Sequence, residues 1–388
     1  MLKSKAGLKF LIVIGAAVLA GSLLIYVFLE ESLQAEDSYA EQIMTECEGK
    51  LDCTMEALRD ISETEEQSTV LVIIKDIIST YEKSSYQCHK EGHHLGMFLY
   101  DYTGNLTQSL SYVEPKCGGA VYHGIIEGFF TEQSLNNANP AEINVREICP
   151  ATANNPYAIH RWECLHGLGH GLSVLYRQDV FTAIHRCDEL EPGWERVNCY
   201  TGVFMQNVIN YYKSEDGALE EDDLLFPCNT VNAKYAPACY FRQTDHIYKQ
   251  NRFSPTTSFK ECDKIIPEEF VKYCYFGMGV QIFYSYLALD RDFDASARQC
   301  QKGQPRYHVD CFGGLVRTIL DATNTDEAFE FCKHIPRQSK VYCYEIIGQY
   351  GHMLHSNNQG RANECSKAES REYFEVCMKA DIESIILL

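Results

Sequence analysis

The amino-acid sequence predicts an all-α protein made of disulfide-stapled helical hairpins behind one N-terminal transmembrane helix. The first observation is the cysteine content, because the 388 residues include 18 cysteines that fall into regular pairs. From Cys187 onward, 10 or 11 residues separate the partners of a pair, and successive pairs repeat at intervals of 32 to 40 residues. A period of this size is typical of stacked helical hairpins. The second observation is an apolar run near the N-terminus.

That run covers residues 10–29, carries no charge, follows Lys3, Lys5 and Lys9, and ends before Glu30. Twenty mostly apolar residues span a bilayer, and the lysines are expected to stay on the cytoplasmic side. We therefore expect residues 1–9 in the cytoplasm, residues 10–29 as a signal anchor, and the rest of a single-pass cell-membrane protein outside. A cleaved signal peptide, ending near Ala20, is the alternative.

Behind the anchor, residues 30–65 are expected to form a juxtamembrane helical segment and residues 66–388 a helical-repeat domain. Within a repeat, a short helix ends at the first cysteine and the second cysteine opens a longer helix. Asp179, Ser254 before Pro255, and Asp292 supply start signals for the short helices. The hairpin period resembles that of tetratricopeptide and Sel1-like solenoids, including their cysteine-stapled members, and this resemblance implies a fold but no functional residue.

The cysteines are interpreted as disulfides. Their number is even, and metal-binding thiolates, the competing interpretation, usually show a Cys-x2-Cys or Cys-x4-Cys spacing that is absent here. Cys88 and Cys117 lack a partner at the regular spacing, so pairing them with each other is a hypothesis that leaves no cysteine over. The predicted bridges are Cys47–Cys53, Cys88–Cys117, Cys149–Cys164, Cys187–Cys199, Cys228–Cys239, Cys262–Cys274, Cys300–Cys311, Cys332–Cys343 and Cys365–Cys377. Such a set requires an oxidising, extracytoplasmic compartment.

The charge balance limits the classes of partner. A formal net charge of −20 disfavours nucleic acid and anionic lipid surfaces. The expected contacts are the membrane, through the N-terminal helix, and a protein or peptide on the concave face of the solenoid.

The best functional clue is that histidines concentrate in the repeats between about residues 86 and 176. Three successive helices carry histidine or glutamate four residues apart, the spacing that places two side chains on one helical face. The candidate metal ligands are His89, His93, His94, His123, Glu127, His166 and His170. Helices packed about 8–10 Å apart can bring such side chains to one ion or to two ions close together.

Imidazole with one carboxylate suits zinc, iron, copper or nickel. Glu127 is a candidate general base beside a metal-activated water. His-Glu-x-x-His and Cys-x-x-Cys-His are absent, which argues against a gluzincin-type protease and c-type haem; b-type haem with two histidine ligands stays open. The competing interpretation is that the histidines are structural, buried and hydrogen-bonded.

Weaker candidates lie elsewhere. His352 and His355 lack an evident partner helix, and Asp245 and His246 point to different helical faces as sequence neighbours. Residues 214–223 form an acidic segment that misses the calcium-loop pattern. Asn105 begins a formal glycosylation sequon.

Two function classes follow. The first is a membrane-anchored extracytoplasmic protein with a His/Glu metal site, as a metalloenzyme or a metal carrier. The second is an extracytoplasmic scaffold or receptor that binds a protein or peptide. The two classes differ in whether the histidines converge in space.

Overall fold

The fold is described from a computed structural model for residues 39–84, 88–114, 117–136, 139–150, 158–214 and 216–381. Within these ranges the chain forms helices and turns and no β-strand, so the predicted all-α class is confirmed. Residues 10–29, predicted to cross the membrane, lie outside these ranges. No helix within them is both long and apolar enough to span a bilayer.

The chain divides into two compact units, residues 1–84 and 85–388. In the first unit, α2 (Leu51–Thr64) packs against α3 (Gln67–Ser84). In α3, Val70, Ile73 and Ile77 are fully buried. Cys47 is bridged to Cys53 at the start of α2.

The second unit alternates long helices with short connecting helices. The long helices are α4 (His89–Thr103), α6 (Ala120–Leu135), α8 (Ile159–Leu175), α10 (Trp194–Ser214), α11 (Ala236–Gln250), α13 (Val271–Ile282), α16 (His308–Ala322) and α18 (Arg337–Leu354). The shorter elements are α5 (Leu106–Tyr112), η1 (Pro140–Glu142), α7 (Val145–Ile148), α9 (Val180–Cys187), α12 (Pro255–Cys262), η2 (Glu268–Phe270), η3 (Phe283–Leu287), α14 (Ala288–Asp290), α15 (Phe293–Cys300), η4 (Pro305–Tyr307), α17 (Thr325–Lys333), α19 (Asn358–Cys365) and α20 (Arg371–Lys379).

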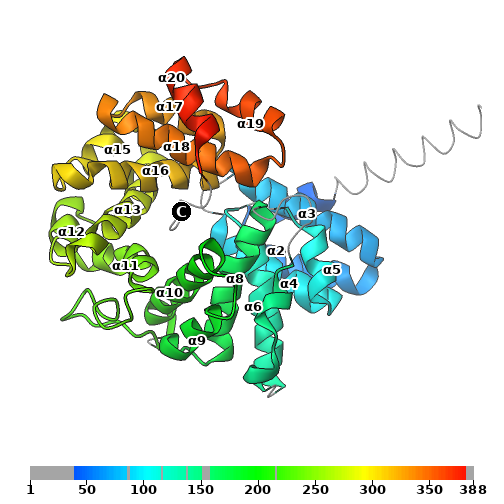
Figure 1. The fold of residues 1–388 in the computed structure, drawn as a ribbon. Helices are drawn as coiled ribbons and strands as arrows, with labels where there is room; N and C mark the ends of the chain where they lie inside the picture. Colours follow the sequence, from blue (N-terminus) through cyan, green and yellow to red (C-terminus); the bar gives the residue numbers. More distant parts are fainter. Residues whose placement is uncertain are drawn as a thin grey trace, which may run out of the picture. The chain divides into compact units, whose positions relative to one another are not determined.

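Each long helix packs against the next one along the chain, from α4 through α18, and α18 packs against α20. This row of helices can be followed in Figure 1 from cyan through green and yellow to orange. The row curves, because the Arg317 guanidinium of α16 lies 5.3 Å from the centre of the Trp162 ring of α8. Side chains far apart in sequence therefore meet on the inner side of the row.

Disulfides staple the hairpins as predicted, and the structure forms all nine expected pairs. The short helices α9, α12, α15 and α19 end at the first cysteine of their pair. Asp179 and Asp292 cap α9 and α15 through side-chain hydrogen bonds, whereas Ser254 occupies the N-cap of α12 without one. Cys88–Cys117 is the exception, since it joins the starts of two long helices, α4 and α6.

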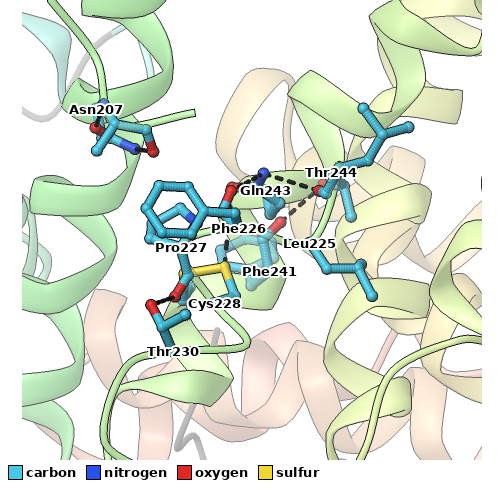
Figure 2. Close-up of a disulfide and its surroundings, with 12 residues drawn as sticks. Asn207, Leu225, Phe226, Pro227, Cys228, Thr230, Phe241, Gln243 and Thr244 are labelled. Carbon is cyan, nitrogen blue, oxygen red and sulfur yellow. Dashed lines mark hydrogen bonds between the residues drawn. A yellow bond between two sulfur atoms is a disulfide. The ribbon is translucent and has the colours of Figure 1, made fainter. Parts of the chain in front are cut away.

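The Cys228–Cys239 staple shows how a repeat with no short helix is held (Figure 2). The acidic segment around residues 214–223 is largely irregular beyond the end of α10. Buried Gln243 of α11 donates hydrogen bonds of 2.9 Å to the carbonyl oxygens of Leu224 and Phe226. Asn207 holds Ala218 through two further hydrogen bonds. The loop before α11 is thus fixed at both ends.

Candidate metal centre

Three neighbouring long helices carry the histidines that the sequence singles out: α4, α6 and α8. Glycines let the helices approach closely, because a Cβ on Gly124 of α6 would overlap the carbonyl oxygen of His93 in α4. A Cβ on Gly167 of α8 would likewise press on the His123 backbone. The helical glycines cost roughly 1 kcal/mol each relative to alanine. Here the glycines allow the backbones of neighbouring helices to touch beside the histidines.

Five imidazoles converge between these helices, and we call them the histidine cluster: His89, His93, His123, His166 and His170. Neighbouring ring centroids lie 4.9 to 5.4 Å apart. Two groups of three can each hold a metal ion, with ligand atoms within 4.8 Å of one another. The first group is His89, His93 and His123, the second is His123, His166 and His170, and His123 belongs to both.

Acceptor groups outside the cluster fix the Nδ1 proton on four of these rings. Nδ1 of His89 donates to the Cys117 carbonyl at 2.9 Å, and Nδ1 of His93 lies 3.1 Å from Oε1 of Glu127. Nδ1 of His170 donates to Oε1 of Gln206 at 2.6 Å. A neutral imidazole carries one N–H, so Nε2 of these rings presents a lone pair.

His166 follows the same rule through Thr201. The Thr201 hydroxyl donates to the Asn198 carbonyl at 2.7 Å, so its oxygen accepts from Nδ1 of His166 at 2.9 Å. Histidines that ligate metals are typically held by an outer partner on the second ring nitrogen in this way. The outer partners of four of the five rings therefore match those of a metal site.

The distance between His89 and His93 carries the strongest chemical implication. Their Nε2 atoms lie 3.3 Å apart, and both present lone pairs when His93 is neutral with its proton on Nδ1. Two lone pairs at this distance repel unless a metal ion or a proton lies between them. Two nitrogens bound at about 2.0–2.1 Å to one tetrahedral ion lie about 3.3 Å apart. The geometry of this pair therefore fits a shared metal ion.

His123 occupies the centre of the cluster and is 1% exposed. Both of its ring nitrogens, and Nε2 of His170, are buried without a hydrogen-bond partner among the residues described. Leaving buried polar atoms unpaired costs about 1–3 kcal/mol each. Glu163 of α8 is the nearest acid, with Oε2 located 3.3 Å from Nε2 of His123.

Burial keeps His89, His123, His166 and His170 uncharged near neutral pH. Burial, helped by the charge on His93, lowers the pKa of His89 to about 3, and burial lowers the pKa of His170 to about 4. Burial also holds the pKa values of His123 and His166 well below the usual value. A metal ion bound by one ring nitrogen requires a neutral imidazole, so rings that bind a single ion do not need to lose a proton first.

The two glutamates differ in their charge. Burial favours the neutral form of Glu127, but the charge and hydrogen bond of His93 lower its pKa to about 2. Burial and the nearby Asp321 raise the pKa of Glu163 to about 8, against the opposing charges of Arg317 and Arg242. Glu127 is therefore a carboxylate near neutral pH, and Glu163 is largely a carboxylic acid.

The predicted site residues fall into three groups. The five cluster histidines come together. Glu127, predicted as a ligand or general base, lies beside the Nδ1 atoms of His93 and His170, at 3.1 and 3.5 Å, where it orients the His93 ring. His94 is half-buried and belongs to neither group of three.

The partners Glu163, Thr201 and Gln206 are absent from the sequence prediction. Only Glu163 could have been found from the sequence, because it precedes His166 by three residues and shares its helical face. Thr201 and Gln206 come from the next helix, α10, and no pattern in their own segment distinguishes them.

The weaker candidates do not form a comparable site. His246 donates or accepts at both ring nitrogens, with Tyr212 and the Glu220 carbonyl, and Asp245 pairs with Lys249. Nε2 of His352 contacts the Ala380 carbonyl, while His355 lies 3.8 Å from Glu364. The Asn105 side chain caps α5 by accepting from the Gln108 amide. Its glycosylation remains a prediction.

The fold and the cluster define a class: an all-helical, disulfide-rich protein of an oxidising, extracytoplasmic compartment, with buried histidine groups able to hold a metal ion. Comparison with known proteins does not narrow this class. The chain matches no protein-family model, and no curated protein is significantly similar to it.

Proposed function

We propose that this protein is an extracytoplasmic metal-binding protein, anchored in the cell membrane by residues 10–29, whose histidine cluster holds divalent transition-metal ions. The single observation that carries the proposal is the 3.3 Å contact between Nε2 of His89 and Nε2 of His93, both of which present lone pairs when His93 is neutral. Zinc, iron and copper all accept imidazole nitrogen, and a tetrahedral zinc ion fits this spacing.

We further propose two metal positions that share His123. Both groups of three histidines include this residue, and each of its ring nitrogens lacks a hydrogen-bond partner among the residues described. One imidazole can serve two ions only as an imidazolate, which has released its ring proton to solvent and binds one ion at each nitrogen. Glu127 then orients His93 in the first position, and Gln206 orients His170 in the second.

A scaffold with purely structural histidines is supported less well. Structural histidines in a core are expected to satisfy both nitrogens, as His246 does through Tyr212 and Glu220. The stacking of successive long helices is compatible with the proposed solenoid and with a partner on its inner side. That surface also carries the histidines, so a partner there would lie beside the metal centre.

A divalent ion at these positions would supply a Lewis acid able to polarise a bound group. An enzyme and a metal carrier share this requirement. The buried Glu163, 3.3 Å from His123, is the acid positioned to exchange a proton with a group bound there. Catalysis therefore remains one form of the proposed function.

Metal content of the natively purified protein tests the proposal. We expect about two ions per chain by inductively coupled plasma mass spectrometry. The double variants H89A/H93A and H166A/H170A should each retain about one ion, and H123A should weaken both positions. H185A, which removes an exposed histidine on α9, is the matched control and should retain the full content.

Three results would change this conclusion. Metal near zero in the natural protein, before and after incubation with zinc, would contradict metal binding. One ion lost equally in both double variants would support a single site instead of two. A Soret band in the absorption spectrum would identify haem in place of single ions.

A further inference from the structure

A cavity of about 310 Å³ lies in the second unit, and no residue of the histidine cluster lines it. Its lining comes from η3, α14, α15 and α17 and from the turns that precede α15 and α17. Clefts that bind small molecules have volumes of about 300–1,000 Å³ and combine apolar walls with a few polar groups. This cavity therefore has the size of a site for a small ligand.

A π-helical turn builds the apolar part of the lining. η3 joins α13 to α14 without a break, and the amide of Ala288 donates to the carbonyl of Phe283, five residues earlier. From this turn Phe283, Leu287 and Ala288 line the cavity, and Phe293 of α15 adds a second aromatic ring. Phe283 and Leu287 are only 1% and 4% exposed. π-helical turns are rare and frequently lie at functional sites.

The polar part of the lining is mainly acidic. Asp326, Glu327 and Glu330 of α17 supply three carboxylates, whereas Arg291 is the one cationic side chain among the lining residues. Nη2 of Arg291 lies 2.9 Å from Oε1 of Glu327, so these two charges compensate each other. The lining therefore carries a formal excess of two negative charges, on Asp326 and Glu330.

These two carboxylates contact cations outside the lining, but only at exposed positions. Nζ of Lys367 lies 2.8 Å from Asp326, and Nζ of Lys333 lies 2.6 Å from Glu330. The side chains of these four residues keep between 38% and 75% of their surface exposed. The other Glu330 oxygen lies 3.6 Å from Nε2 of His334. Exposed ion pairs contribute only about 0–1 kcal/mol, so both carboxylates can bind a further cation with little loss.

We propose that this cavity binds a small organic cation, a primary amine with an aromatic body. The aromatic body packs against Phe283, Leu287 and Phe293, and the ammonium group is bound by Asp326 and Glu330. The chain as a whole has a formal net charge of −20, which also attracts cations. This site is separate from the proposed metal centre and does not depend on it.

Three probes with the same aromatic ring and different charges test the proposal by isothermal titration calorimetry. Phenethylamine is a cation, phenylacetate is an anion and 2-phenylethanol is neutral. We expect phenethylamine to bind the natively purified protein saturably, 2-phenylethanol to bind at least about tenfold more weakly, and phenylacetate not to bind. The H89A/H93A variant should bind phenethylamine like the natural protein, since the amine does not contact the metal centre.

A matched pair of charge variants tests the acidic part of the lining. D326N/E330Q should weaken phenethylamine binding at least about tenfold. E269Q/E372Q neutralises two exposed carboxylates outside the lining and should bind the amine like the natural protein.

A second pair of variants tests the cavity itself. A288L places a larger side chain at a half-buried position of the lining and should abolish binding, whereas A362L makes the same change at a half-buried position of α19 outside the lining. Phenethylamine should raise the melting temperature of the natural protein and of A362L but not that of A288L. The melting transition of A288L without amine shows whether this variant is folded.

The proposal is overturned if phenethylamine does not bind saturably, or if phenylacetate or 2-phenylethanol binds as tightly. Unchanged affinity in D326N/E330Q or in folded A288L would also overturn it. Loss of binding in H89A/H93A would assign the amine to the metal centre and contradict a separate site. Amine binding by a natural protein that contains no metal would support this site and contradict only the proposed function.

Discussion

Three helix pairs in the second unit make the same backbone contact but carry different side chains at it. In the pairs α4/α6, α8/α10 and α13/α16, a glycine of the second helix faces a carbonyl oxygen of the first helix. The glycines are Gly124, Gly202 and Gly314, and the carbonyls belong to His93, His166 and Phe276. These contacts place His93, His166 and Phe276 at equivalent positions.

The equivalence extends along the second helix of each pair. His123 corresponds to Thr201 and Gly313, and Glu127 corresponds to Met205 and Arg317, by their distance from the shared glycine. The first two pairs thus supply imidazoles and a carboxylate, which attract a metal cation. The third pair supplies an arginine, Arg317, which is ion-paired with Asp321. One backbone arrangement carries different charged groups in the two regions, because the contact depends only on glycine.

The largest expected effect concerns the disulfide that is unique to the histidine region. C88A/C117A should lower the free energy of unfolding by about 3–4 kcal/mol, from the loop that this bridge closes. It should also reduce metal content, since Cys117 accepts the His89 hydrogen bond beside the bridge. C332A/C343A should cost about 3 kcal/mol and leave metal content unchanged. Chemical denaturation and metal analysis of both variants measure this difference.

The shared glycine contact predicts that two equivalent variants lose the same free energy of unfolding but differ in zinc binding. G124A and G314A should each cost about 3 kcal/mol or more, because the added Cβ overlaps a carbonyl oxygen of the neighbouring helix. Only G124A should weaken zinc binding. G351A is the control, because its Cβ would meet no atom closer than 4.0 Å. If G124A leaves the free energy of unfolding unchanged, the close approach of α4 and α6 is contradicted.

Acid should destabilise the metal-free protein through the histidine region. The folded pKa values of His89, about 3, and His170, about 4, lie below the usual 6.5. Between pH 6.5 and 4 the unfolded chain therefore binds protons that the folded chain does not, and stability falls as the pH falls. One such histidine contributes about 2 kcal/mol of this loss at pH 5. Urea denaturation from pH 7.5 to 4.5 measures the slope.

The H170N variant should flatten that slope, because it removes one of the titrating groups, whereas the exposed H185N should not. A slope in H170N equal to that of the natural protein would mean that His170 is not held neutral by burial.

The smallest expected effects concern Thr201 and Gln206, which accept hydrogen bonds from His166 and His170. T201V and Q206L remove the acceptors for His166 and His170, and each should weaken zinc binding 10- to 100-fold in a competition titration with a chromophoric chelator. T318V is the control in the third pair, since the Thr318 hydroxyl donates only to the carbonyl of Gly314 in its own helix. Equal zinc affinity in T201V, Q206L and T318V would argue against the assigned Nδ1 hydrogen bonds.

The predicted ligands lie together although equivalent histidines stand at different distances from the cysteine that precedes them. His166 follows Cys164 by two residues, whereas the equivalent His93 follows Cys88 by five. A shift of three residues is close to one helical turn, so both histidines still face the same side. His94 shows the limit of this argument, because one further residue rotates the side chain away from the cluster.

Residues drawn from other helices could not be predicted. Thr201 and Gln206 act on histidines in the preceding helix, and the positive charge of Arg242 in α11 helps burial to lower the pKa of His166. Each looks like an ordinary polar residue in its own segment. Their roles depend on which face of one helix meets the next, and periodicity within one segment does not contain that information.

The sequence by itself determined the helical class, the regularly spaced bridges, the oxidising compartment and a set of candidate ligands that includes the five histidines, because cysteine spacing and helical periodicity are local properties. The tertiary structure alone decided that the histidines form two groups sharing His123 and that Glu127 orients His93. It also decided that the row of helices brings Arg317 of α16 over Trp162 of α8. These outcomes depend on contacts between distant segments, and close packing at glycine fixes them through backbone geometry that no short sequence pattern encodes.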